Sequence, residues 1–249
     1  MPFDPYSLTI ILMGLAFGSF FKGLTGMGLP LVAVPILAGF LGAEHAIVVM
    51  QIPGLVSNAW LVWSHRRSAV EVPMRYDMIV PSVIAVVVGV WFLDFADERV
   101  TVLLLAGTVA VFLAVLLLKP SFHLDGVIGR IITPLASLFG GFAQGAAGVS
   151  GPLFSTLILS FRLKREAYVF YNGLLFGLFN LVQIGAMIWF DMFTWQRTLE
   201  GFLALIPLFI FQSLGMRAMG AISTKAFNVA VITVIICMEI KLVWNGLGG

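Results

Sequence analysis

The chain has few of the residues on which soluble enzymes and secreted domains depend. Only 10% of its 249 residues are charged, and a formal net charge of +2 is too small to indicate nucleic-acid binding. A single cysteine, Cys237, excludes an intramolecular disulfide. The three histidines, His45, His65 and His123, lack metal-ligand spacing. Nucleotide-binding, hydrolase and metalloprotease motifs are missing as well, so we expect no enzyme, no cofactor and no metal site.

Hydrophobic residues dominate what is present. They make up 60% of the chain, and the mean hydropathy is +1.06, far above the values of soluble domains. The apolar runs are too long and too uniform for the alternating strands of a transmembrane barrel. The composition therefore predicts an all-α integral membrane protein.

Ten apolar segments can be marked along the chain. They are Leu8 to Phe21, Leu31 to Leu41, Ala46 to Trp63, Met78 to Leu93, Val100 to Leu118, Ile131 to Ala143, Leu153 to Phe161, Ala167 to Phe190, Leu199 to Met216 and Phe227 to Trp244. Most approach the roughly 20 residues that a helix needs to cross a bilayer. The four shorter segments flank two glycine-rich stretches, a pattern typical of transporter binding sites.

The glycine-rich stretches run from Gly23 to Pro30 and from Gly145 to Pro152. Glycine tolerates positive φ and proline suits the first turn of a helix, so each stretch predicts a break between two helices. Broken backbone inside a membrane is tolerated where it is buried in protein or faces a polar cavity. The two breaks therefore favour a substrate site, although glycines that only allow close helix packing are the alternative.

An internal repeat relates the two breaks. At a fixed offset of 122 residues, 12 of the 42 positions from Phe17 to Asn58 are identical in the second half, including Pro30 with Pro152, Glu44 with Glu166 and Asn58 with Asn180. We interpret this as a duplication. Residues 1–118 form the first membrane repeat, 119–130 a cytoplasmic linker and 131–249 the second repeat.

The basic residues predict the orientation in the membrane. If the chain changes side with every segment, 11 of the 14 lysines and arginines fall on one side, which the positive-inside rule makes cytoplasmic. Both termini are then outside the cytoplasmic (inner) membrane. Each half has five segments, an odd number, so the repeats have inverted topology. Whether the short pairs at the start of each repeat are re-entrant or span fully stays open.

Polar residues and glycines at and near the breaks are the candidate substrate-binding residues. They are Lys22, Thr25, Gly26, Gly28, Gln51, Asn58, Gln144, Gly148, Ser150, Gly151, Asn172 and Asn180. Two helix N-termini at the breaks would bind an anion through backbone N–H groups, with hydroxyl and amide donors beside them. The alternatives are that the amides only connect helices and that Lys22 extends to the cytoplasmic headgroups.

At these residues the chain resembles the TauE/SafE family of sulfite exporters and sulfonate permeases. The resemblance covers nearly the whole chain and rests on the small size, the two homologous halves and the glycine-rich stretch in each. Ala147 replaces the hydroxyl residue in the second copy, and Leu29 replaces the usual small residue in the first.

The resemblance implies transport of a small sulfur-containing anion, such as sulfite, sulfoacetate or another organosulfonate. We expect a secondary transporter with an anion site at the midplane, working by alternating access and moving its substrate outward. An anion channel and a non-transporting assembly or chaperone subunit are the alternatives. The expected partners are the anion and the lipid bilayer, with no nucleic acid; a homodimer is left open.

Overall fold

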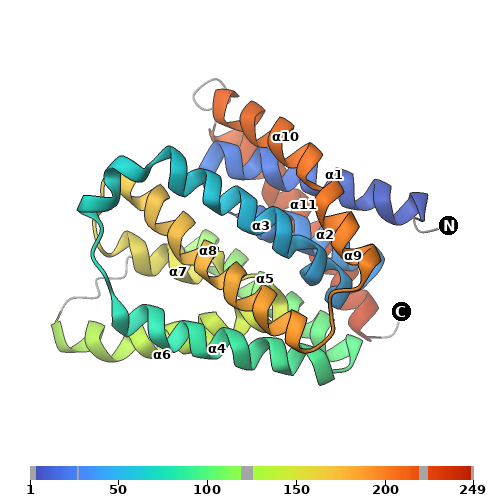
Figure 1. Cartoon of the computed structure of the whole chain (residues 1–249), viewed down its shortest axis with the longest axis horizontal. Coiled ribbons are helices and arrows are strands. Elements are labelled where there is room, and N and C mark those ends of the chain that lie inside the picture. The colour runs from blue at the N-terminus through green and yellow to red at the C-terminus, as the bar shows by residue number, and fades with distance from the viewer. Residues whose placement is uncertain (1–3, 27, 119–125, 219–223, 248–249) are drawn as a thin grey trace.

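The fold is a bundle of α-helices in which the chain runs back and forth along one long axis (Figure 1). The computed structural model describes residues 4–26, 28–118, 126–218 and 224–247. Its elements are α1 (Pro5–Thr25), α2 (Leu29–Leu41), α3 (Ala43–Ser64), the 3₁₀ helix η1 (Arg66–Glu71), α4 (Tyr76–Phe95), α5 (Glu98–Leu118), α6 (Gly126–Ala147), α7 (Gly151–Leu159), α8 (Arg165–Trp189), α9 (Trp195–Leu203), α10 (Leu205–Ala218) and α11 (Thr224–Leu247). The described residues contain no strand, which confirms the all-helical prediction.

Nine of the ten predicted segments correspond to single helices. The remaining segment, Leu199 to Met216, is divided into α9 and α10. Pro207 lacks the N–H that would bond to the carbonyl of Leu203, so the helix is interrupted there. The linker was placed at 119–130, but α6 already begins at Gly126, and residues 119–125, including His123, lie outside the described residues.

Only one helix of each hairpin is short, where the sequence indicated two. The helices α1 and α6 have 21 and 22 residues, about 30 Å at 1.5 Å per residue, because their glycines remain helical. The helices α2 and α7 have 13 and 9 residues, too few to span a bilayer. A Cβ at Gly14 would meet Leu37, and one at Gly18 would meet Ala33 and Leu29, so α2 folds back antiparallel to α1.

The two halves pack against each other through matching glycine contacts. In the contact of α1 with α10, a Cβ on Gly23 would collide with the carbonyl oxygen of Gln212 and lie 2.9 Å from Gly215 Cα. In the contact of α6 with α4, a Cβ on Gly145 would collide with the carbonyl oxygen of Val86 and lie 2.8 Å from Gly89 Cα. The first helix of each half therefore packs on the fourth predicted segment of the other half, and α3 packs on α8 at the centre.

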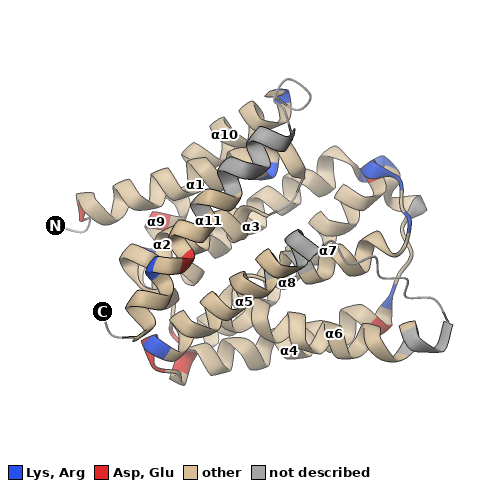
Figure 2. Cartoon of the chain, turned by 180° about the vertical axis from the view of Figure 1, so that it is seen from behind, with Lys and Arg blue, Asp and Glu red and all other residues tan. Residues whose placement is uncertain are grey.

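The exterior of the bundle is apolar along its length. Large side chains such as Phe17, Trp91 and Phe139 are exposed on the outer helices, whereas polar side chains such as Gln51 and Gln183 are buried. Charged residues gather at the two ends of the bundle (Figure 2). By length and composition, α1, α3, α4, α8 and the α9–α10 pair can each cross a membrane.

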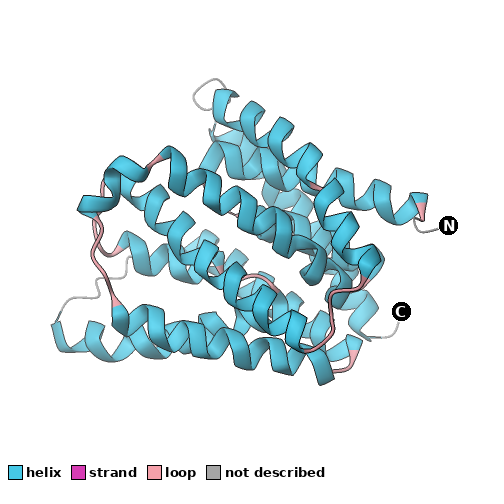
Figure 3. Ribbon diagram, viewed as in Figure 1, coloured by secondary structure: helices cyan, strands magenta, loops and turns pink. Residues whose placement is uncertain are grey.

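Short connections join the helices at the two ends of the bundle (Figure 3). The N-terminus of α1 and the C-terminus of α11 lie at the same end, whereas α6 begins at the opposite end (Figure 1). Two polar contacts connect the first turn of α3 to α9. Arg197 Nη1 donates to Glu44 Oε1 at 2.6 Å, and His45 Nε2 lies 2.6 Å from Glu200 Oε2. Glu44 thus forms an ion pair at the end of the bundle and does not line the pocket described below.

Candidate functional site

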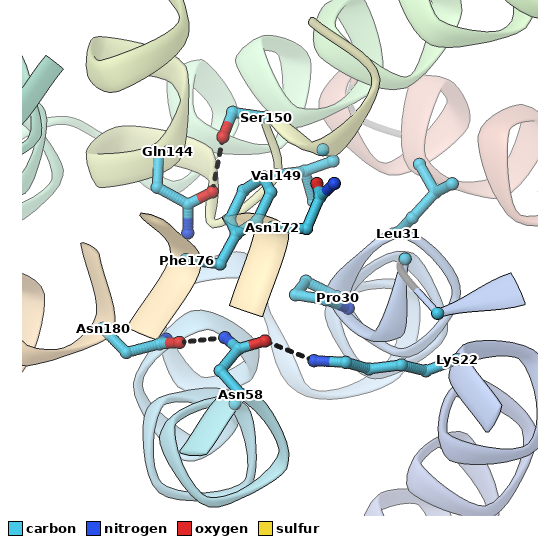
Figure 4. Close-up of a pocket in the computed structure, with 14 residues that line it drawn as sticks. Lys22, Pro30, Leu31, Asn58, Gln144, Val149, Ser150, Asn172, Phe176 and Asn180 are labelled. Atoms are coloured by element: carbon cyan, nitrogen blue, oxygen red, sulfur yellow. Dashed lines mark hydrogen bonds between the residues drawn. The ribbon is translucent and has the colours of Figure 1, made fainter. Parts of the chain in front are cut away.

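A pocket lies where the two helix breaks face each other across α3 and α8 (Figure 4). The space between the lining residues, counted together with the part that is open to solvent, is about 500 Å³. It is lined by Lys22, Gly26, Gly28, Pro30, Leu31, Gly54, Asn58, Gln144, Val149, Ser150, Gly151, Asn172, Phe176 and Asn180. Both halves of the chain therefore contribute to one cavity.

Glycines in the left-handed conformation create the two breaks. Gly26 has φ +81° and its N–H donates to the carbonyl of Lys22 at 2.7 Å. Gly148 has φ +69° and its N–H donates to the carbonyl of Gln144 at 3.0 Å. This is the usual way in which glycine ends a helix. Because the cap is the same in both halves, Lys22 and Gln144 stand in the last turn before each break and line the pocket.

Lys22 is a buried lysine at one side of the pocket. Only 4% of the residue is exposed, and its Nζ donates to Asn58 Oδ1 at 2.5 Å. Among the described residues, no carboxylate forms an ion pair with it. An ammonium has three N–H donors, so this bond leaves two of them for another acceptor.

A chain of amides extends from Lys22 into α8 and back to α3. Asn58 Nδ2 donates to Asn180 Oδ1, Asn180 Nδ2 donates to Gln51 Oε1, and Gln51 Nε2 donates to the carbonyl of Ile47, each at 2.9 Å. The ammonium at one end only donates and the backbone carbonyl at the other end only accepts. The orientation of all three amides is therefore fixed by chemistry, with each oxygen toward Lys22.

A second chain holds Gln144 at the other side of the pocket. Gln183 Nε2 donates to the Gln144 backbone carbonyl and Gln144 Nε2 donates to Gln183 Oε1, both at 2.9 Å. Gln144 Oε1 in turn accepts from Ser150 Oγ at 2.7 Å. Gln183 is fully buried and does not line the pocket, so it acts on the pocket through Gln144.

The structure brings nine of the twelve candidate residues into the pocket lining. The three others lie beside it: Thr25 Oγ1 donates to the carbonyl of Phe21, Gln51 lies behind Asn180, and Gly148 forms the cap of α6. Ser150 lines the pocket, but its hydroxyl proton is directed to Gln144. The hydroxyl groups of Thr25 and Ser150 were expected to donate to the substrate, and in this structure both donate to protein oxygens instead.

Five residues of the lining were not among the candidates. They are Pro30, Leu31, Gly54, Val149 and Phe176. Gly54 and Phe176 precede Asn58 and Asn180 by four residues, so one helical turn back from each asparagine was a signal that could have found them. Within the described residues, no group of three histidine, cysteine or acidic side chains is placed to hold a metal.

Comparison with known families identifies the family of this chain. The model of the sulfite exporter TauE/SafE family matches residues 10–242, nearly the whole chain. The chain belongs to this family. No curated protein and no solved structure matches it.

Membership confirms the resemblance that the two glycine-rich stretches indicated. TauE/SafE proteins are membrane transporters of the sulfite exporter type, not enzymes. With at least five helices able to cross a bilayer, this TauE/SafE chain is a multi-pass membrane protein. The matched region contains both helix breaks and every residue of the pocket lining.

Proposed function

We propose that this TauE/SafE protein is a secondary carrier that exports a small sulfur-containing anion, sulfite or an organosulfonate, by alternating access. The observation that carries the proposal is Lys22, a buried lysine without a carboxylate partner among the described residues, in a pocket to which both halves contribute. The candidate residues that line this pocket, together with Gln51 behind it, form the proposed substrate site.

The energetics of Lys22 support an anionic ligand. A lysine within the membrane costs about 2.5 to 3.5 kcal/mol on insertion scales. Asn58 satisfies one N–H of the ammonium but brings no negative charge. A sulfite or sulfonate oxygen would accept from the remaining N–H groups and compensate the charge. The amide N–H groups of Asn58 and Asn180 that are not used within the chain are further donors beside it.

The packing of the halves supports an inverted repeat. The glycine contacts exchange equivalent helices, α1 on α10 and α6 on α4, as a two-fold relation requires. The helices α1 and α6 run in opposite directions (Figure 1). In inverted-repeat carriers such a relation allows the same site to open to either side in turn. We place the termini outside the cytoplasmic membrane, in accordance with the basic residues.

The proposal is tested with purified protein in two steps. Sulfite or ethanesulfonate should raise the melting temperature more than chloride does at equal ionic strength, because a ligand that binds only the folded state stabilises it. Equal responses to all three anions would indicate an assembly subunit without a substrate site.

Counterflow in proteoliposomes then separates a carrier from a channel. Unlabelled sulfite inside the vesicles should accelerate the entry of labelled sulfite if one site alternates between the two sides. Downhill leakage without such trans-stimulation would favour an anion channel.

A further inference from the structure

The pocket offers different hydrogen-bonding groups at its two sides. Lys22 presents an ammonium at one side, and Ser150 lies across the pocket from it, with Phe176 and Pro30 between them in the view of Figure 4. The hydrogen-bond chains behind these two residues determine what each can offer to a ligand.

The hydrogen-bond chain through Gln183 and Gln144 makes the Ser150 oxygen an acceptor for a ligand. The Gln144 backbone carbonyl can only accept, so Gln183 must turn its Nε2 toward it and its Oε1 toward Gln144 Nε2. Gln144 Oε1 is then left to accept the hydroxyl proton of Ser150. With its proton committed, Ser150 Oγ presents only lone pairs to the pocket.

The first turn of α7 adds one donor beside that oxygen. Pro152 has no N–H, and the N–H groups of Leu153 and Phe154 donate to the carbonyl of Ser150 at 3.1 and 3.3 Å. Of the first four residues of α7, this leaves Gly151, which lines the pocket, as the one whose N–H can donate to a ligand. The Ser150 side thus combines an acceptor with a single backbone donor.

We propose that the substrate is a small organic anion that carries a hydroxyl group, with its anionic group at Lys22 and its hydroxyl at Ser150 and Gly151. A hydroxyl both donates and accepts, so it can pair with both groups at this side. A purely aliphatic tail would leave them without partners, and a second carboxylate would face the lone pairs of Ser150. The apolar side chains of Phe176 and Pro30 suit the carbon chain between the two groups. This inference rests on the proposed function.

The test compares two probes that differ by one hydroxyl. Ethanesulfonate and 2-hydroxyethanesulfonate carry the same charge, and their dissociation constants are measured on purified wild-type protein by calorimetry. We expect 2-hydroxyethanesulfonate to bind about 2- to 10-fold more tightly, the range of one neutral hydrogen bond. Equal affinity, or tighter binding of ethanesulfonate, would overturn the inference while leaving the proposed anion site intact.

Three variants test whether Ser150 causes the preference for 2-hydroxyethanesulfonate over ethanesulfonate. Ser150→Ala should bring the affinity ratio close to 1, and Gln183→Met should reduce it because Gln144 is then free to turn its amide. Ser213→Ala is the matched control, since this serine donates to the Phe209 carbonyl on α10, outside the pocket, and should keep the wild-type ratio. A wild-type ratio in Ser150→Ala would contradict recognition by this hydroxyl. If wild-type protein binds neither probe nor sulfite, the proposed function itself fails.

Discussion

Asn58 and Asn180, which the proposed repeat places at equivalent positions, hydrogen-bond to each other, with Asn58 Nδ2 donating to Asn180 Oδ1 at 2.9 Å. Two positions exchanged by a two-fold rotation touch only near the axis. In the proposed inverted repeat the pair therefore lies where the halves turn about each other. The bond is also asymmetric, because only Asn58 receives the ammonium of Lys22. The pocket thus has a lysine on one side only, although residues of both halves line it.

Asn58→Asp tests the electrostatics of this pair. The carboxylate would form an ion pair with Lys22 and neutralise the cation, and opposite charges about 4 Å apart attract by several kcal/mol at intermediate dielectric. We expect the affinity for sulfite, measured by calorimetry, to fall at least about tenfold. Asn58→Ala removes the same acceptor without adding charge and should cost less. Equal losses in the two variants would speak against a charge effect.

Gly23→Ala tests the contact between the halves. Its methyl group would collide with the Gln212 backbone carbonyl, which cannot move without shifting α10. We expect a clear loss of thermal stability in detergent. Gly107→Ala is the control, because a Cβ there meets nothing within 4 Å and alanine favours a helix by about 1 kcal/mol over glycine. The close packing of α1 on α10 would be in doubt if both variants melted alike.

Gly26→Val and Gly148→Val test the helix breaks. Both glycines have positive φ, which a β-branched residue rarely adopts, and the apolar length of the helices does not change. Membrane insertion should persist while sulfite counterflow is lost. Wild-type transport in both variants would rule out a site built on the breaks.

The contact between α3 and α9 provides a prediction about buried and exposed charges. The Glu200 side chain is 1% exposed and accepts from Gln196 as well as contacting His45, whereas the Glu44 side chain is 41% exposed. Glu44→Gln should change the free energy of unfolding by about 1 kcal/mol or less. His45→Ala should cost about 3 kcal/mol, because it removes the main partner of a buried carboxylate. Comparison of their melting temperatures checks this order, and a larger loss in Glu44→Gln would reverse it.

The helices and their two breaks could be predicted because they depend on local signals. Apolar length indicated the segments, and glycine followed by proline indicated where α1 and α6 end. The lengths of α1 and α6 were underestimated because Gly23 and Gly145 serve helix packing, which the sequence does not distinguish from helix breaking. The interruption before Pro207 was missed although proline is a local signal.

The site was predictable to the extent that it follows the repeat. The offset of 122 residues singled out Asn58 and Asn180, and polar residues next to the breaks led to Lys22, Gln144 and Ser150. The acceptors of the Thr25 and Ser150 hydroxyl groups could not be predicted, because they depend on side-chain conformation and on neighbours from other helices. The part played by Gln183 likewise depends on α8 facing the end of α6, which no local pattern encodes.

The central claim is that Lys22 binds the anion, and paired affinity measurements on Lys22→Gln and Gln144→Ala test it most directly. The two residues occupy equivalent positions before the two breaks, and both line the pocket. The account predicts that Lys22→Gln lowers the affinity for sulfite at least about tenfold, because a charge in a low dielectric is lost. Gln144→Ala should cost only about the few-fold of a neutral hydrogen bond. Wild-type sulfite affinity in folded Lys22→Gln protein would contradict the account.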